Sequence, residues 1–110
     1  MDISQSQKDD VTIVALAGRF DAQSAGDVED SLKSALEGGA KKILVDMGDV
    51  EYISSAGLRV LLSTAKKLAG SSGKLVLCGL KPYVREVFEV AGFTTIFMIL
   101  PDVDEGLKAF

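Results

Sequence analysis

The sequence predicts an α/β domain with a small, mostly parallel sheet. Its 110 residues are enough for one compact domain with a single core, and we assign residues 1–110 to that domain. Apolar runs of strand type alternate with amphipathic helical stripes, and glycines separate them. The predicted order is β-β-α-β-α-β-α-β-α. Because strand–helix–strand crossovers are right-handed, we expect parallel neighbours after an N-terminal antiparallel hairpin, with four to five strands and about four helices.

The N-terminal part of the chain predicts the hairpin. The apolar run Val11–Ala17 ends at Gly18 and is typical of a strand. The polar segment Ile3–Gln7 can pair with it through a turn at residues 8–10.

The segment Ala25–Glu37 predicts the first helix, because its apolar residues recur at helical spacing. Either Asp21 or Ser24 can cap its start. The pair Gly38-Gly39 can end it in a left-handed conformation.

The middle of the chain predicts a buried strand and the most regular helix. Ile43–Val45 is a short continuous apolar run, as in a strand that is covered on both faces. A loop is expected over Met47–Ile53, followed by a helix over Ser55–Ala69. Val60 lies off the apolar stripe of this helix. The stripe consists of Leu58, Leu61, Leu62, Ala65, Leu68 and Ala69.

The C-terminal part repeats the alternation. Lys74–Cys78 predicts a second buried strand, and Pro82 is well placed in the first turn of a helix that stops at Gly92. Thr95–Met98 is expected to form the last strand. Asp102–Phe110 is expected to form a short acidic helix.

Residue types that catalysis commonly needs are scarce. The chain has no His and one Cys, so it lacks an imidazole base and a His metal ligand. A lone Cys can neither close an internal disulfide nor build a cysteine-rich zinc site. Cys78 follows apolar residues and is expected to be a buried structural thiol rather than a reactive one. We therefore predict that the protein is not an enzyme and uses no metal and no cofactor.

Net charge and hydropathy limit where the protein can be located and what it can bind. The net charge is −4 and the pI is about 4.7, which disfavours nucleic acid as a partner. Residues 1–10 lack the apolar core of a signal peptide. The longest apolar run, Ile96–Leu100, is far shorter than a membrane span of about 18 residues. These features predict a cytoplasmic protein that does not insert into a membrane.

The most informative segment is Asp46–Leu62, which joins the buried strand to the second predicted helix. In open α/β sheets, ligands and modifications usually lie beyond the carboxyl ends of the strands. The small residues Ser54, Ser55, Ala56 and Gly57 leave the backbone there open to close approach. The first turn of a helix also tolerates a phosphate, because its N–H groups are unpaired. A plain serine N-cap, from Ser54 or Ser55, explains the same residues without any function.

Other polar residues near this segment allow two interpretations. Asp21 can be a helix cap or part of an interaction surface. Arg59 and Ser63 lie on the polar side of the second predicted helix, where they can contact a partner or simply face water.

At this point the sequence resembles a known family. Tyr52–Leu62, YISSAGLRVLL, is similar to the signature of STAS domains, the family of bacterial anti-sigma factor antagonists. Gly18–Ala25 resembles the G-x-x-D segment of the family, and Lys74–Phe93 resembles its next strand and helix. The resemblance covers nearly the whole chain and implies a STAS-like single domain.

The resemblance implies a partner-switching mechanism. The unphosphorylated antagonist binds an anti-sigma factor that is also a serine/threonine kinase of GHKL type, which releases the sigma factor. The kinase then phosphorylates the antagonist at the start of the helix after the central strand. The phosphorylated form dissociates, and a PP2C-type phosphatase resets it. Members of this type act mostly as monomers.

The family motif is often D-S-[ST]-G-L or D-S-A-G-L. Ser54 stands at the Asp position, and Ala56, just before the glycine, cannot be modified. Ser55 is therefore the candidate phosphorylation site, with Ser54 as the second candidate. The resemblance and the predicted topology together suggest the partner-binding residues Asp21, Ser24, Ser54, Ser55, Ala56, Gly57, Arg59 and Ser63.

Two other functions stay open from the sequence. The chain can be a non-phosphorylated scaffold subunit of a stressosome-like or transporter-linked complex, which would not need either serine. It can also be a small enzyme or nucleotide-binding module, although it supplies no nucleophile–base pair and no P-loop.

Overall fold

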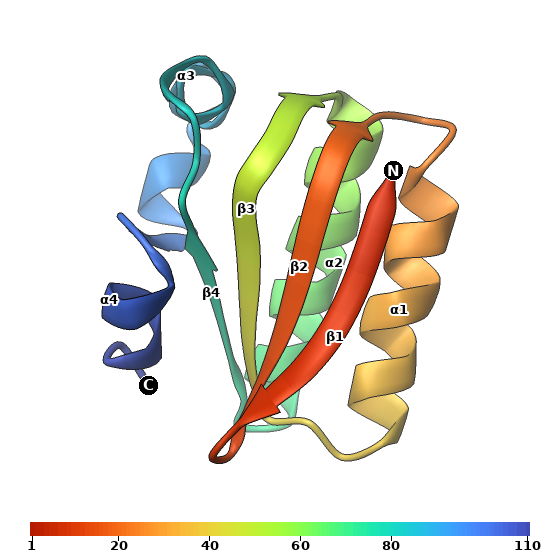
Figure 1. Cartoon of the computed structure of the whole chain (residues 1–110), viewed down its shortest axis with the longest axis vertical. Coiled ribbons are helices and arrows are strands. Elements are labelled where there is room, and N and C mark those ends of the chain that lie inside the picture. Colours follow the sequence, from red (N-terminus) through yellow and green to blue (C-terminus); the bar gives the residue numbers. More distant parts are fainter.

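The computed structural model describes residues 1–110 and has a five-stranded sheet at its centre (Figure 1). The strands are β1 (Asp2–Lys8), β2 (Val11–Phe20), β3 (Lys42–Ile53), β4 (Lys74–Cys78) and β5 (Met98–Leu100). The helices are α1 (Ala25–Glu37), α2 (Ser55–Gly70), α3 (Pro82–Val90), the 3-10 helix η1 (Phe93–Thr95) and α4 (Val103–Leu107). The strands lie in the order β1-β2-β3-β4-β5. The predicted α/β class and element order are confirmed.

β1 and β2 form the predicted antiparallel hairpin, and all later neighbours in the sheet are parallel. The turn at Asp9-Asp10 matches the expected one. The prediction that the second strand ends at Gly18 is wrong, because β2 continues to Phe20. Gly18 adopts a φ of +109°, which only glycine tolerates easily, and this lets the strand bend without leaving the sheet.

The prediction of a loop over Met47–Ile53 is also wrong, since the whole segment belongs to β3. Register shifts in the pairing with β2 explain the error. Between Asp46 and Asp49, β3 advances three residues while β2 advances two, and a second shift follows Val50. Such bulges interrupt the alternation of buried and exposed residues, so the segment lacks the period of two that marks a strand in a sequence.

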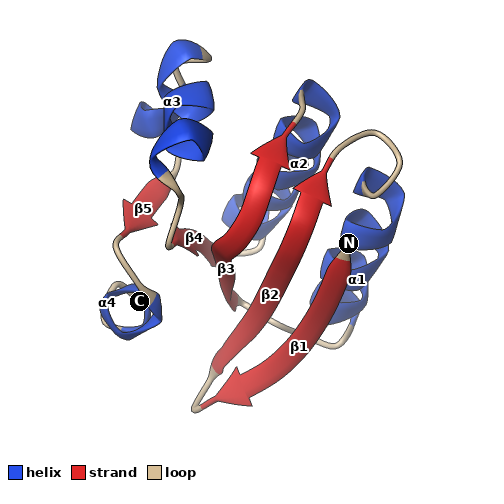
Figure 2. Cartoon of the chain, turned by 45° about the horizontal axis from the view of Figure 1, so that its top comes forward, coloured by secondary structure: helices blue, strands red, loops and turns tan.

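The two faces of the sheet have separate cores. α1 and α2 cover one face, and α4 lies on the other (Figure 2). The larger core contains 20 buried residues, including the fully buried Phe20, Leu32 and Leu61. The smaller core lies under α4 and consists of Val11, Leu44, Val76 and Cys78. No helix has both the length and the apolar character that crossing a membrane requires.

The buried face of α2 differs from the predicted stripe. Val60, which we expected off the core face, is 7% exposed, and Thr64 is 5% exposed, whereas Ala69 is exposed. The reason is that α2 packs against α1 as well as against the sheet, which widens and rotates its buried face. Thr64 satisfies its hydroxyl by donating to the Val60 carbonyl oxygen at 2.9 Å.

The last strand is shifted from its predicted place at Thr95–Met98. β5 begins only at Met98, because η1 ends at Thr95, and Ile96 and Phe97 connect the two elements. Phe97 is the cause, because its ring turns into the larger core and packs edge-on against Phe88 and Phe93, with centroid distances of 5.7 and 5.9 Å. The terminal helix α4 is five residues long, which is shorter than the segment 102–110 that we expected.

Candidate functional site

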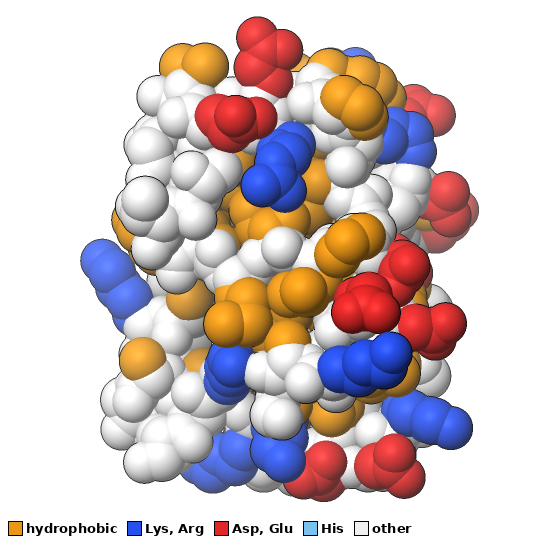
Figure 3. Space-filling view, turned by 90° about the vertical axis from the view of Figure 1, so that its left-hand side faces the viewer, with side chains coloured by type: hydrophobic (Ala, Val, Ile, Leu, Met, Phe, Trp, Pro, Cys, Tyr) orange, Lys and Arg blue, Asp and Glu red, His pale blue; other side chains and the backbone are white.

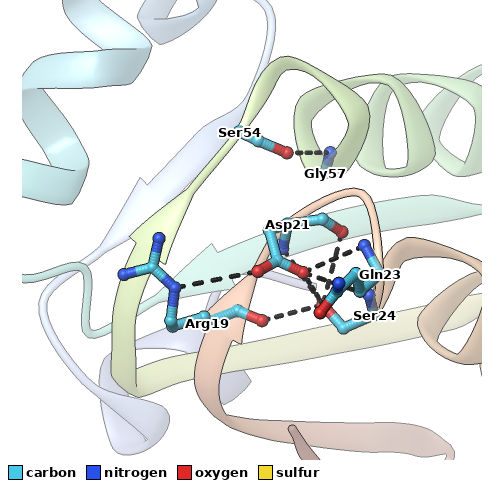
Figure 4. Close-up of polar contacts among 6 residues, drawn as sticks. All are labelled: Arg19, Asp21, Gln23, Ser24, Ser54 and Gly57. Atoms are coloured by element: carbon cyan, nitrogen blue, oxygen red, sulfur yellow. Dashed lines mark hydrogen bonds and ion pairs between the residues drawn. The ribbon is translucent and has the colours of Figure 1, made fainter.

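Ser54 joins the end of β3 to the start of α2 and has a structural role. Its backbone is extended, with a φ of −97° and a ψ of 173°, and its Oγ accepts a hydrogen bond from Gly57 N at 3.4 Å (Figure 4). Its own N–H donates to the Phe20 carbonyl oxygen at 2.9 Å. Ser54 is therefore the N-cap of α2, and it also ties the ends of β2 and β3 together.

Ser55 differs from its neighbour. It is the first residue of α2, its side chain is exposed, and its hydroxyl makes no hydrogen bond to another residue. The two serines are adjacent in sequence, but only Ser54 is used by the fold. Ser55 therefore presents a free hydroxyl at the carboxyl end of the sheet.

Gly57 allows β2 to approach the first turn of α2. A Cβ on this residue would lie 2.9 Å from the Phe20 carbonyl oxygen and 3.0 Å from both the Phe20 ring and Ile53. No real Cβ tolerates a carbonyl oxygen at that distance, so the close approach requires glycine. Gly57 thus leaves room for the end of β2, and the turn that follows it, to lie beside Ser54.

That turn is Asp21–Ser24, and its polar groups bond to one another (Figure 4). Asp21 Oδ1 accepts from the backbone N–H groups of Gln23 and Ser24 at 3.0 and 3.2 Å. Ser24 Oγ donates to the Arg19 carbonyl oxygen at 2.7 Å and accepts from Asp21 N at 3.0 Å. Ser24 is 7% exposed, so its hydroxyl is engaged inside the turn and not presented at the surface.

The Asp21 carboxylate is stabilised by these contacts. Partial burial works against ionisation, but the hydrogen bonds from Ser24 and Gln23 outweigh it and hold the pKa of Asp21 below its ordinary value. Arg19 adds a smaller effect through Nε, which lies 3.7 Å from Asp21 Oδ2. The same guanidinium lies over the ring of Tyr52, 4.3 Å from its centroid.

The remaining predicted site residues lie on α2. Arg59 is exposed one turn beyond Ser55, Ser63 is half-buried one turn further, and Ala56 is half-buried in the first turn. The structure thus brings Asp21 and the first turn of α2 together at the carboxyl ends of β2 and β3. Arg59 and Ser63 extend the same helix away from that end.

Sequence reasoning missed a groove between α2 and α3. It has a volume of about 400 Å³ and joins Ser55 and Leu58 of α2 to one stripe of α3. The α3 side is formed by Tyr83, Glu86, Val87, Val90 and Ala91. Val90 is 82% exposed and Tyr83 is 52% exposed, which leaves apolar surface beside Ser55. The signal in the sequence was a second apolar stripe on α3, next to the buried pair Val84 and Phe88.

The side of the molecule that carries α3 and α4 presents such apolar side chains between charged ones (Figure 3). A separate, mostly polar hollow of about 500 Å³ lies where Lys42 begins β3, beside the hairpin and the C-terminal end of α1. It lies at the start of β3, at the opposite end of that strand from Ser54 and Ser55, and contains none of the predicted site residues.

Side chains that could together hold a metal ion are not gathered at this site. No group of three or more acidic or cysteine side chains is arranged as a metal site requires. Cys78 is buried, as predicted, and burial together with the nearby Asp46 and Asp102 raises the pKa of its thiol to about 12. What the site offers is an exposed hydroxyl, a fixed carboxylate and an apolar groove.

Comparison with known proteins identifies the family. A family model described as STAS domain matches residues 2–106. The chain belongs to the STAS domain family. This STAS domain is 40% identical over 110 residues to BtrV of Bordetella bronchiseptica, whose provisional name is anti-sigma factor antagonist. The match covers 100% of this chain and 95% of BtrV.

Solved structures share the fold of this STAS domain. An anti-sigma factor antagonist from Mycobacterium paratuberculosis superposes with a TM-score of 0.91 at 24% identity, covering 98% of this chain and 92% of that one. The Bacillus cell fate determinant SpoIIAA, in its phosphorylated form, superposes with a TM-score of 0.77 at 18% identity, covering 98% of both chains. At these identities the likeness establishes the fold.

Proposed function

We propose that this STAS domain is an anti-sigma factor antagonist that works by partner switching in the cytoplasm. In its unphosphorylated form it binds, as a monomer, an anti-sigma factor that is also a serine/threonine kinase of GHKL type, and the sigma factor is released. The kinase phosphorylates the chain, the phosphorylated chain dissociates, and a PP2C-type phosphatase restores it. The chain itself acts by binding and not by catalysis.

The observation that carries the proposal is the exposed hydroxyl of Ser55 in a chain that is 40% identical to BtrV over its full length. In the phosphorylation step, the Ser55 hydroxyl attacks the γ-phosphorus of ATP and loses its proton to a base of the kinase. The bond to the bridging oxygen breaks and ADP leaves. An exposed first-turn serine can reach a bound nucleotide without any unfolding of α2.

Ser54 is the weaker candidate for modification on structural grounds. Its Oγ accepts from Gly57 N and its N–H holds the end of β2. A phosphate on Ser54 would have to keep both contacts while entering a half-buried position. Ser55 has no such constraint.

Charge explains how a phosphate would end binding. A phosphate adds nearly two negative charges at neutral pH to a chain whose net charge is already −4. At a contact surface, that charge must be desolvated or matched by the partner, and both are costly. A loss of only 1.4 kcal/mol of binding free energy lowers affinity tenfold.

The proposed contact surface consists of Asp21 and the exposed part of the first two turns of α2. Ser55 lies at its centre, and Arg59 and Ser63 extend it along α2. Ser24, Ser54 and Gly57 support this surface from within, because their contacts fix the turn and the helix start.

The test is phosphotransfer from the GHKL-type kinase of the same genome to the purified chain. With Mg-ATP, we expect the wild type and Ser54→Ala to gain one phosphate by mass spectrometry, and Ser55→Ala to gain none. Ser34→Ala, on an exposed part of α1, is the control for removal of a hydroxyl. Equal labelling of wild type and Ser55→Ala would refute the assignment.

Binding is measured separately by titration calorimetry against the same kinase. We expect the unmodified chain to bind at least tenfold more tightly than the phosphorylated chain. Equal affinities, together with normal regulation in cells by a chain with both serines replaced by alanine, would refute partner switching. That result would favour a constitutive scaffold subunit of a stressosome-like or transporter-linked complex.

A further inference from the structure

Glu86 is the only charged side chain that lines the groove containing Ser55. Tyr83, Glu86, Val87 and Val90 recur at intervals of three and four residues, so they form one stripe along α3 that faces the groove. No Lys or Arg side chain lines the groove. A group added to Ser55 therefore borders a groove whose lining carries one negative charge and no Lys or Arg side chain. The N-terminus of α2 and Arg59 favour the charged phosphate, and they are the same in wild type and in a Glu86 variant.

Other charged groups near Ser55 lie outside the groove. Arg59 is exposed on α2 four residues beyond Ser55, a spacing that makes the two side chains neighbours on the helix surface. Asp21 follows Phe20 at the end of β2, whose carbonyl oxygen accepts from Ser54 N. Figure 2 shows α3 and the end of β2 on opposite sides of the end of β3. Tyr83 adds an uncharged phenol on the α3 side.

We propose that Glu86 opposes the charge of a phosphate on Ser55. The phosphorylated site then keeps its second proton up to a higher pH than the same site without the Glu86 carboxylate. The inference rests on the proposed phosphorylation of Ser55. Two anions in one groove repel each other, and this disfavours the doubly ionised phosphate. Arg59 acts in the opposite direction, because a nearby cation favours the dianion.

The consequence is that pH adjusts the strength of the switch. An ordinary phosphoserine loses its second proton near pH 6. A neighbouring carboxylate raises that pKa, so the phosphate gains its second charge at a higher pH. The charge that drives the partner away therefore grows as the pH rises toward neutrality, and Glu86 sets where this happens.

The experiment uses the full chain with phosphoserine placed at position 55 during translation. The second pKa of the phosphate is measured by ³¹P NMR titration at low salt. We expect Glu86→Gln to lower this pKa by about 0.3 to 0.5 and Glu86→Lys to lower it by about twice as much. Arg59→Gln is expected to raise it.

Glu89→Gln is the matched control. Glu89 lies on the same helix and is exposed, but it does not line the groove, so the substitution removes one negative charge elsewhere on α3. We expect it to change the pKa less than Glu86→Gln does, because Coulomb energy falls with distance and the Glu89 carboxylate lies outside the groove. In about 1 M NaCl, where the Debye length is about 3 Å, the difference between wild type and Glu86→Gln should largely vanish.

An identical titration for wild type and Glu86→Gln, or equal effects of Glu86→Gln and Glu89→Gln, would overturn the inference. Because the phosphate is installed during translation, the result does not depend on any kinase. If Glu86→Gln leaves the titration unchanged and the kinase labels Ser55 normally, only the role of Glu86 is refuted. If Glu86→Gln changes the titration but no kinase labels the chain, only the proposed phosphorylation is refuted. Amide NMR spectra of each variant confirm that the fold is kept.

Discussion

At the scale of single residues, the site separates two adjacent serines by function. Ser54 caps α2 and holds the end of β2, whereas Ser55 keeps a free hydroxyl in the first turn. The resemblance to the family motif placed Ser54 at a position that is often Asp, and Asp is as good an N-cap as Ser. The structure gives this position a role that either residue can fill, which is to accept from the backbone of the first turn.

Gly57 is predicted to be required for the close contact between β2 and α2. In Gly57→Ala the new methyl group meets the Phe20 carbonyl oxygen at 2.9 Å, so β2 or α2 must shift. We expect a loss of about 1 to 3 kcal/mol in the free energy of unfolding, measured by urea denaturation. Gly70→Ala is the control at the other end of α2, where a Cβ meets nothing within 4 Å, and it should be neutral or stabilise by up to about 1 kcal/mol. Equal stabilities of the two variants would contradict this account.

Asp21 is predicted to make stability depend on pH. Its pKa is lowered in the folded chain, despite partial burial, by the hydrogen bonds from Ser24 and Gln23. A lowered folded pKa means that the carboxylate stabilises the fold above the unfolded pKa of about 3.9, and that this stabilisation is lost as the pH falls through the folded value.

The measurement is the urea midpoint of wild type and Asp21→Ala at pH 6 and at pH 3. We expect a clear difference at pH 6 that shrinks at pH 3. Asp30→Ala, on an exposed part of α1, controls for the loss of one negative charge. A difference between wild type and Asp21→Ala that stays constant across this range would argue against the role of the turn.

At the scale of elements, the bounds were predicted correctly where the apolar pattern is regular, as in α1 and in β4, whose bounds Lys74–Cys78 are the predicted ones. α1 matches its predicted bounds, because a long stripe of apolar residues with a period of 3.6 and a glycine stop leave few alternatives. β3 was predicted far too short, because its bulges spoil the period of two. β5 was misplaced, because Phe97 packs against Phe88 and Phe93 instead of continuing a strand. Phe88 lies on α3, so a local apolar run does not indicate this contact.

Only the part of the candidate site that depends on local sequence could be predicted. The first turn of α2 could be recognised from Ser54–Gly57, since serines and glycine at a helix start have a local meaning. The α3 side of the groove could not, because a helix stripe gives no sign of which other helix it faces. Tyr83 and Glu86 become neighbours of Ser55 only through the packing of α3 beside α2.

Val60 tests the buried face of α2. We expect Val60→Ala to lower the free energy of unfolding by about 2 kcal/mol, because two methyl groups leave a packed core where Val60 is 7% exposed. Val90→Ala removes the same atoms from a residue that is 82% exposed, so its stability should stay within about 0.5 kcal/mol of the wild type. Thermal and urea denaturation measure both. A mild effect of Val60→Ala would mean that α1 does not cover this side of α2.

At the scale of the whole molecule, the single thiol reports on global opening. Cys78 belongs to the small core under α4, and burial with the nearby Asp46 and Asp102 raises its pKa to about 12. At pH 8 the folded chain therefore carries a protonated, enclosed thiol, whereas a free cysteine is partly ionised.

We expect the folded chain to react with a thiol reagent such as DTNB only as fast as it unfolds, and the chain in 6 M guanidinium chloride to react at once. Raising the pH from 7 to 9 should strongly increase the rate at which the unfolded chain reacts with DTNB. In the folded chain the reaction rate should rise only as far as the rate of unfolding rises. Rapid labelling of the folded chain at pH 8 would show that α4 leaves this core open.

The order of the strands also bears on how the chain is made. Each strand of the sheet lies beside the strands that come before and after it in the sequence. As the polypeptide leaves the ribosome, each new strand therefore finds its neighbour already in place, and no early strand has to wait for a late one. α4 emerges last and closes the second face of the sheet over Leu44 and Val76. Synthesis from the N-terminus can thus assemble the domain in a single direction, with the junction of β3 and α2 at Ser54-Ser55 formed before β4 and β5 are added.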